Sequence, residues 1–305
     1  MKSLFFFCLL ASSISMLISQ STEDLSKTII TSDVDLFWQC YDEAEGNITG
    51  ATFKKYIDEG SMGVKGFLKF RIVNAKKLAK TVKQDKAYYE LVREGSLGIK
   101  EAFAEEIVTV YDQMIDWYPE AVIPDVYFVM GRKNSGGTAF DGGLIMGAEM
   151  FGPQGNENGP NAIIEYQVIP SIVAHELIHF QQKYPQSKTL LDQTIKEGAA
   201  DFLAYLIQER ELKHHLDDWA APKVAELWKI FQEEMLDTSY QGWLYGGSQE
   251  VMPDAPRDLG YWLGFYICKA YYLKQDDPKQ AVEDILTIQD SEAFLAESGF
   301  NGELP

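Results

Sequence analysis

Residues 171 to 182 read Ser-Ile-Val-Ala-His-Glu-Leu-Ile-His-Phe-Gln-Gln. His175 and His179 are four residues apart, so on a helix their imidazoles project from one face and can reach the same cation. Glu176 follows the first histidine, and its carboxylate would lie beside the cation rather than on it. The other side of this helix is apolar, and Pro170 suits a helix start. The segment therefore predicts a partly buried helix with one metal-binding face.

A catalytic zinc site uses three protein ligands and leaves one position open, so a third ligand is needed. Glu197 supplies it within the run Glu-Gly-Ala-Ala-Asp-Phe. Glu197 and Asp201 share a helix face, so one carboxylate can bind Zn²⁺ while the other accepts a hydrogen bond from a ligating imidazole. We expect two short antiparallel helices, joined across a turn at residues 185–189, to bring these groups to His175 and His179.

Chance matches to the His-Glu-x-x-His pattern are common, and two such histidines can simply be satisfied polar groups. The acidic pair downstream favours metal binding, since two of the four histidines of the chain fall in this one pattern. The other two, His214 and His215, are adjacent and point in different directions on a helix. We expect them to face solvent rather than form a second metal site. Arg257 could meet a substrate carboxylate or bond to its own loop, and the sequence leaves both readings open.

Helical spacing dominates the rest of the chain. It predicts helices over residues 33–93, with a break or turn at the glycines of residues 60–66, and an amphipathic helix over residues 101–117. Helical character returns after Pro170 and continues to about residue 290, with breaks near residue 185 and in residues 246–256.

Two strands are predicted before the histidine-bearing helix. Residues 125–131 and 142–151 are β-rich, and a loop rich in Gly, Asn and Asp joins them as in a hairpin. Residues 152–161 are rich in Gly, Pro and Asn and should form an exposed loop. The fold class is therefore α+β, predominantly helical, with a small mixed sheet that precedes the metal-binding helix.

The first residues are typical of an exported protein. A lysine at position 2 precedes an almost uncharged apolar stretch from Leu4 to Ile18, which predicts a signal peptide over residues 1–19. An uncleaved N-terminal anchor is the alternative. No second long apolar run follows, so we expect no membrane span after cleavage, one domain over residues 20–305, and a secreted or periplasmic location.

Charge and cysteine content narrow the possible partners. The chain holds 46 acidic and 27 basic residues, a formal net charge of -19. This excess would repel nucleic acid and anionic membrane surfaces. Cys40 and Cys268 remain after signal removal, and in an oxidising compartment they could form a disulfide or stay as two buried thiols.

The motifs at residues 175–179 and 197–201 resemble those of the gluzincin clan of zinc metallopeptidases. The wider chain resembles a bacterial family of predicted secreted zinc-dependent proteases that is related to a gliding-motility lipoprotein group. That wider likeness includes Tyr-Ile-Asp-Glu-Gly at residues 56–60 and Gly-Tyr-Trp-Leu-Gly at residues 260–264. It implies a zincin-like fold in which an edge strand, such as residues 142–151, holds an extended substrate by backbone pairing.

The resemblance implies hydrolysis of a peptide or protein substrate by a zinc-activated water, with Glu176 as the general base. Tyr261 is the candidate donor to the oxyanion, or else a core aromatic, and Tyr245 is a weaker competitor. The oligomeric state is not predicted.

Two alternatives remain open. The first is a non-catalytic exported zinc-binding protein in a secretion or motility assembly, which Glu176 disfavours because a structural site needs no base. The second is a zinc amidase or deformylase. A deformylase is disfavoured by the carboxylate third ligand and by the lack of a cysteine near the helix.

Overall fold

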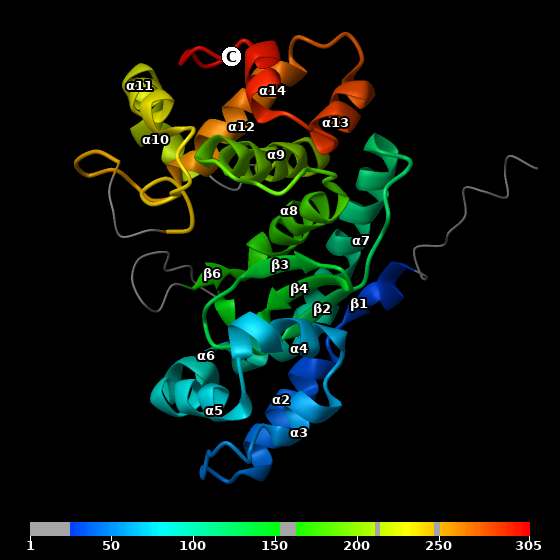
Figure 1. Cartoon of the computed structure of the whole chain (residues 1–305). Coiled ribbons are helices and arrows are strands. Elements are labelled where there is room, and N and C mark those ends of the chain that lie inside the picture. Colours follow the sequence, from blue (N-terminus) through cyan, green and yellow to red (C-terminus); the bar gives the residue numbers. More distant parts are fainter. Residues whose placement is uncertain (1–24, 153–162, 211–213, 247–250) are drawn as a thin grey trace, which may run out of the picture.

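A computed structural model describes residues 25–152, 163–210, 214–246 and 251–305 (Figure 1). The predicted signal peptide and nearly all of the predicted loop at 152–161 lie outside these ranges. One hydrophobic cluster contains buried residues from Leu25 to Phe300. Among the described residues, no helix is long and apolar enough to cross a membrane.

The N-terminal part is helical, as the apolar spacing predicts. Its elements are α2 (Ser32–Glu43), α3 (Lys54–Glu59), α4 (Met62–Phe67), the π-helix η2 (Leu68–Ile72), α5 (Ala75–Gln84), α6 (Lys86–Leu97) and α7 (Ile99–Trp117). The predicted break is confirmed at Gly60, but Gly63 and Gly66 lie inside α4. A Cβ at Gly63 would come within 2.3 Å of the Tyr127 side chain, so these glycines let α4 pack closely on the sheet.

The main sheet has the strand order β1-β2-β4-β3. Its strands are β1 (Ile29–Ile30), β2 (Val126–Val129), β3 (Gly137–Phe140) and β4 (Gly143–Gly147). β2 pairs in parallel with both β1 and β4, whereas β3 pairs with β4 in antiparallel fashion. The sheet is therefore mixed and small, as expected.

Two predictions about this sheet are wrong. Residues 125–131 and 142–151 form no hairpin, because the connecting segment supplies the additional strand β3 and leaves β2 and β4 parallel. The predicted strand at 142–151 is also divided into β4, a 3₁₀ turn η3 (Ala148–Met150) and β5 (Phe151–Gly152), which pairs with β6 (Ile164–Glu165). β4 is an interior strand, so the open edge belongs to β3.

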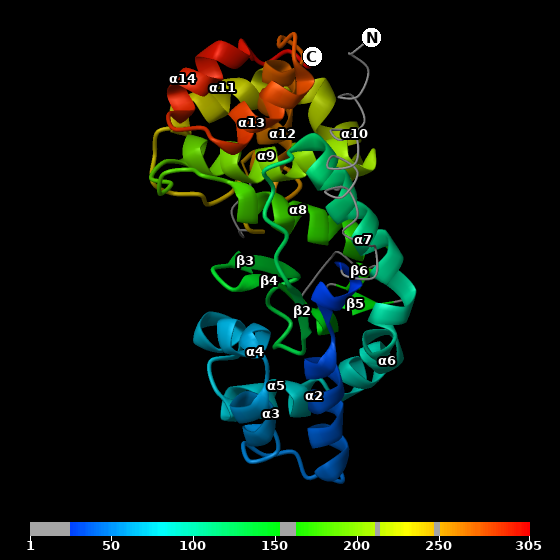
Figure 2. The ribbon, with the colours of Figure 1, turned by 90° about the vertical axis from the view of Figure 1, so that its right-hand side faces the viewer.

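The C-terminal half is also helical. After the turn η4 (Tyr166–Val168) come α8 (Ile169–Gln181), α9 (Leu190–Gln208), η5 (His214–Leu216), α10 (Asp217–Ala220), η6 (Ala221–Lys223), α11 (Val224–Glu234), α12 (Leu259–Tyr272), α13 (Pro278–Leu286) and α14 (Ser291–Ser298). The sheet and α8 lie between α9 and α12–α14 at one end of the molecule and α2–α6 at the other (Figures 1 and 2). Cys40 in α2 and Cys268 in α12 are both buried free thiols, so the disulfide alternative is not realised.

Candidate metal centre

Local sequence signals set the two helices that carry the candidate ligands. α8 has Pro170 in its first turn, where a missing backbone N–H costs nothing. α9 begins with a capping box in which the Thr189 side chain accepts from the backbone N–H of Asp192 and the Asp192 carboxylate accepts from that of Thr189. The link between the helices spans residues 182–189, close to the predicted turn, but α9 is longer than the short helix expected, at 19 residues.

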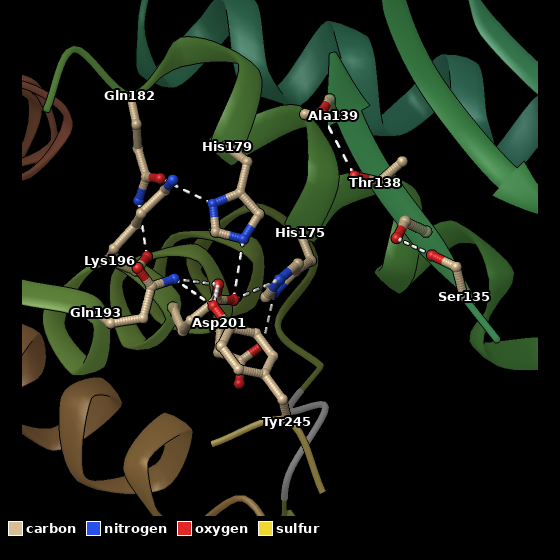
Figure 3. A network of polar contacts seen from close by, with 12 residues as sticks. Ser135, Thr138, Ala139, His175, His179, Gln182, Gln193, Lys196, Asp201 and Tyr245 are labelled. Atoms are coloured by element: carbon tan, nitrogen blue, oxygen red, sulfur yellow. Dashed lines mark hydrogen bonds and ion pairs between the residues drawn. The ribbon is translucent and has the colours of Figure 1, made fainter. Parts of the chain in front are cut away.

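The structure brings His175, His179 and Glu197 together (Figure 3). Glu197 Oε2 lies 3.1 Å from His179 Nε2 and 3.5 Å from His175 Nε2. One ligand atom from each of the three residues lies within 4.8 Å of the other two. Two zinc ligands with bonds of about 2.0 Å in tetrahedral geometry are about 3.3 Å apart, so the observed spacing fits a shared zinc ion.

The opposite nitrogen of each imidazole is already bonded. His175 Nδ1 lies 2.7 Å from Asp201 Oδ1, and His179 Nδ1 lies 2.8 Å from Gln182 Oε1. Both partners are acceptors, so Nδ1 carries the proton and the Nε2 lone pair is left for a cation. Gln182 is held in turn by its amide, which donates to the carbonyl of Lys196 on α9. Asp201 thus lies where the sequence puts it, whereas the role of Gln182 was missed.

Glu197 is held by further contacts on its second oxygen. Gln193 Nε2 and the Tyr245 hydroxyl both donate to Oε1 at 2.9 Å, which leaves Oε2 facing the imidazoles. Gln193 also donates to the Tyr245 oxygen. Gln193 precedes Glu197 by one helical turn, so the spacing rule used for the histidines could have identified it.

The electrostatics of this cluster favour a cation. Burial alone would lower the pKa of His175, but the carboxylates of Asp201 and Glu197 outweigh it and raise that pKa to about 10. Burial alone would raise the pKa of Glu197, but the two imidazoles hold it well below its usual range. The carboxylates therefore keep a proton on His175 at neutral pH when no metal is bound, and a cation bound at Nε2 would take the place of that proton. Two nitrogens and one carboxylate oxygen are also a donor set that zinc takes in catalytic sites.

Glu176 lies on the same side of α8, against the open edge of β3. It is only 8% exposed, and its pKa is raised by burial, an effect that the nearby imidazoles and a hydrogen bond from the Ala139 backbone N–H partly offset. A Cβ at Gly137 would lie 2.7 Å from Glu176 Oε1. Glycine at this position therefore allows the strand to pass directly beside the carboxylate.

Both candidate tyrosines face the cluster. Tyr261, in the first turn of α12, has its ring centroid 6.3 Å from that of His175 and 6.1 Å from that of Tyr245. Burial raises the pKa of both phenols strongly, and the Glu197 carboxylate raises it further. The Tyr245 hydroxyl donates to Glu197, and the backbone of Tyr245 has a φ of 63°, in the left-handed region.

A cleft of about 470 Å³ contains this cluster. Its lining comes from six parts of the chain: Arg71 of η2, residues 137–139 of β3, side chains of α8, side chains of α9, Tyr245, and Tyr261 of α12. A neighbouring pocket of about 310 Å³ shares His179, Gln193 and Lys196 with it. Arg257 is not among the lining residues, and His215 is exposed, as expected. The side chain of His214 is not among those that the structure describes.

Comparison with known proteins supports this location for the site. Residues 158–295 match a family described as "Predicted Zn-dependent protease (DUF2268)". The match covers less than half of the chain, and it leaves out Arg71 and the main sheet. Searches of curated proteins and of solved structures gave no significant match. The segment that carries all three converging side chains is thus similar to a family of predicted zinc-dependent proteases.

Proposed function

We propose that this protein is an exported zinc metallopeptidase with a gluzincin-type ligand set of His175, His179 and Glu197. The observation that carries the proposal is the convergence of these three side chains beside a fourth, Glu176, in one open cleft. A structural zinc site has four protein ligands and is closed. Among the described residues, this cluster offers three ligands and opens to a cleft of about 470 Å³.

Zinc, when bound, makes water acidic enough to attack at neutral pH and polarises the scissile carbonyl. Glu176 takes the proton of the attacking water and later delivers it to the leaving amine. Its burial suits the first of these roles, because a raised pKa makes the carboxylate a better proton acceptor. The Ala139 N–H holds the carboxylate in place through the hydrogen bond described above.

The open edge of β3 is the proposed binding surface for the peptide backbone. An extended chain can add to an exposed strand by main-chain hydrogen bonds, which leave its side chains to select the sequence. The Ala139 N–H already donates to Glu176, so the pairing would use other main-chain groups of this edge. β3 forms one wall of the cleft, directly beside Glu176. A substrate paired with this strand would therefore present its scissile bond to the base and the metal site.

Tyr261 is the proposed donor to the tetrahedral oxyanion, with Tyr245 as its competitor. A phenol must keep its proton to donate a hydrogen bond. The raised pKa values keep both side chains protonated at neutral pH. Tyr245 already donates to Glu197, so its proton is engaged in holding a candidate ligand, which makes Tyr245 the weaker candidate for this role.

Export is part of the proposal and is supported by the signal-peptide pattern of residues 1–19. The N-terminal sequence of the protein recovered from its native host tests this point. A start near residue 20 in a secreted or periplasmic fraction is the expected result. A membrane-bound protein that still begins at Met1 would show an anchor instead.

The central test compares wild type with Glu176→Gln. The variant should keep zinc, because Glu176 is not among the three ligands, and should hydrolyse a mixed peptide library at least ~100-fold more slowly. Metal analysis and mass spectrometry of the products measure the two effects. Glu106→Gln, at an exposed position on α7, is the matched control and should resemble wild type. Equal rates in wild type and Glu176→Gln would rule out this base. Zinc binding without hydrolysis in either would favour a non-catalytic zinc-binding protein.

A further inference from the structure

The N-terminal helices contribute one charged side chain to the cleft. Arg71 lies in η2 (Leu68–Ile72), about a hundred residues before α8, and lines the cleft together with β3 and the metal cluster. Nothing in the proposed hydrolysis uses a cation at this place. The match to the protease family begins at residue 158, so Arg71 lies outside it.

The backbone around Arg71 is unusual. η2 is a π-helix, a conformation that is rare and often marks functional sites. It ends at Val73, whose φ of 70° is costly for a β-branched residue. Next to Arg71, the Phe70 side chain is 72% exposed. A strained turn that presents a cation to a cleft, next to an exposed aromatic side chain, is more typical of recognition than of core packing.

Hydrogen bonds fix this turn relative to β3. Arg71 Nη1 donates to the carbonyl of Asn134 at 3.1 Å, and the Asn134 amide donates to the carbonyl of Arg71 at 3.2 Å. Asn134 lies three residues before Gly137, where β3 begins. Arg71 is therefore held near the N-terminal end of the strand that we propose binds substrate.

Arg71 keeps hydrogen-bonding capacity for a ligand. A guanidinium has five N–H donors, and the other donors of Arg71 have no acceptor in the part of the chain that the structure describes. Its planar fork matches a carboxylate, and such charge-assisted bonds are about twice as strong as neutral ones. The whole chain has a net charge of -19, so a cation in the cleft provides local attraction for an anion that the rest of the surface repels.

Strand direction decides which part of a substrate lies near Arg71. In the antiparallel pairing, which is the more stable one, the substrate runs toward its own C-terminus as β3 is followed back from Phe140 to Gly137. Glu176 lies beside Gly137 and Ala139, so the scissile bond belongs there. The residues after that bond then extend toward Asn134 and Arg71.

We propose that Arg71 is a specificity residue that binds a carboxylate on the leaving-group side of the scissile bond. The carboxylate belongs either to an acidic side chain shortly after that bond or to a free C-terminus. Among the described residues, Arg71 forms no hydrogen bond or ion pair with the metal ligands or the base, and it acts on substrate selection rather than on proton transfer. This inference rests on the proposed peptidase function.

The first experiment measures kcat/KM for matched peptides that differ after the scissile bond. One pair has Glu or Gln in an amidated peptide, and another has a free or amidated C-terminus, so the two sources of the carboxylate are separated. Wild type should prefer the carboxylate in at least one pair by about 10-fold. Arg71→Gln should lose that preference, which is read as the ratio of kcat/KM for the two peptides of a pair within the same variant. Arg71→Lys, which keeps the charge but not the fork, should retain part of it.

Lys69→Gln is the matched control, since it removes one exposed positive charge from the same turn and should leave the preference unchanged. The preference of wild type should also weaken as salt is raised, because part of it is Coulombic. An unchanged ratio in Arg71→Gln, with hydrolysis intact, would overturn the inference.

A binding measurement separates this inference from the proposed function. Fluorescence anisotropy of labelled peptides with zinc-loaded Glu176→Gln, with and without Arg71→Gln, requires no turnover. If binding discriminates between Glu and Gln peptides and this discrimination depends on Arg71, carboxylate recognition is supported even when wild type hydrolyses no peptide. The absence of hydrolysis would in that case refute the peptidase function alone. Binding without discrimination would refute the role of Arg71 and leave the peptidase standing.

Discussion

Asp201 is a buried carboxylate that supports the candidate metal site without being one of its three candidate ligands. It is 3% exposed, and its Oδ1 accepts from His175 Nδ1 at 2.7 Å. Its other oxygen, Oδ2, is buried without a hydrogen-bond partner in the described part of the chain. The full negative charge therefore acts on the imidazole of His175, which makes Nε2 a better ligand.

Asp201→Asn tests this contribution. The amide keeps the shape of the side chain but removes its charge, so zinc affinity should fall by about 10-fold to 100-fold. Titration against a chromophoric chelator measures the affinity. Asp218→Asn, at an exposed position in α10, should bind zinc as wild type does. Equal affinities of the three proteins would show that the hydrogen bond to His175 does not tune the site.

The two cleft tyrosines should respond differently to loss of their hydroxyls. Tyr261→Phe should reduce kcat by about 100-fold and leave zinc affinity almost unchanged, because this phenol is the proposed donor to the oxyanion. Tyr245→Phe should mainly weaken zinc binding, since it removes a hydrogen bond to Glu197. Steady-state kinetics at saturating zinc, combined with chelator competition, separate the two effects. A large loss of kcat in Tyr245→Phe alone would exchange these assignments.

At the scale of elements, the close crossing of α9 and α12 sets the positions of Glu197, on α9, and Tyr261, on α12, relative to each other. Two glycines lie at this crossing. A Cβ built at Gly198 would be 2.1 Å from the Gly264 backbone, and one at Gly264 would be 2.0 Å from the Thr194 carbonyl. The two helices touch backbone to backbone, and Gly198 is the residue directly after the candidate ligand Glu197.

Gly198→Ala should therefore separate the two helices. We expect a loss of about 1–3 kcal/mol in the free energy of unfolding, as for other overpacked cores, and weaker zinc binding as Glu197 shifts. Urea unfolding measures the first effect and chelator titration the second. Gly98→Ala is the control, because its Cβ would meet nothing closer than 3.5 Å, and its change should stay within about 0.5 kcal/mol. A stable Gly198→Ala with full zinc affinity would contradict the close crossing.

At the scale of the whole molecule, the pH dependence of stability should contain a contribution from a carboxyl that does not line the cleft. Glu149 is fully buried and accepts hydrogen bonds from the backbone N–H groups of Gly131 and Lys133. Burial raises its pKa from 4.5 to about 7, although these hydrogen bonds and the Lys133 charge oppose the shift. The Glu149 carboxyl thus holds the segment after β2 in place, but its ionisation lowers the free energy of unfolding.

The sign of the effect follows from the direction of the shift. Below pH 4.5 the Glu149 carboxyl is protonated in both the folded and the unfolded protein, and its contribution to the free energy of unfolding is complete. As the pH rises, the unfolded chain loses the proton first, so stability falls until the folded pKa of about 7 is passed. The total loss is on the order of 3 kcal/mol.

Glu149→Gln cannot titrate and should lack this dependence. The unfolding free energy of wild type minus that of the variant should therefore decrease as the pH rises from about 5 to about 8. Urea unfolding at several pH values gives this difference. The exposed Glu106→Gln should give a curve parallel to that of wild type. A constant difference between wild type and Glu149→Gln across this range would show that Glu149 titrates normally.

Local spacing in the sequence determined much of this molecule. Residues four apart on a helix share a face whatever surrounds them, so the pairing of His175 with His179, and of Glu197 with Asp201, was readable before any fold was known. The same periodicity identified α7 and most of the N-terminal helices. The predominantly helical α+β class follows from these local signals.

Only the tertiary structure decided which distant segments meet. β3 has four residues, beginning with glycine, and is a strand only because it pairs with β4, so the open edge was assigned to the wrong segment. Arg71 reaches the cleft through the packing of η2 against the loop before β3, and no local pattern marks it. Cys40 and Cys268 likewise stay apart because their helices belong to opposite ends of the fold (Figure 1). Periodicity records which face of an element is buried, whereas the partner of that face is set by packing between residues far apart in the chain.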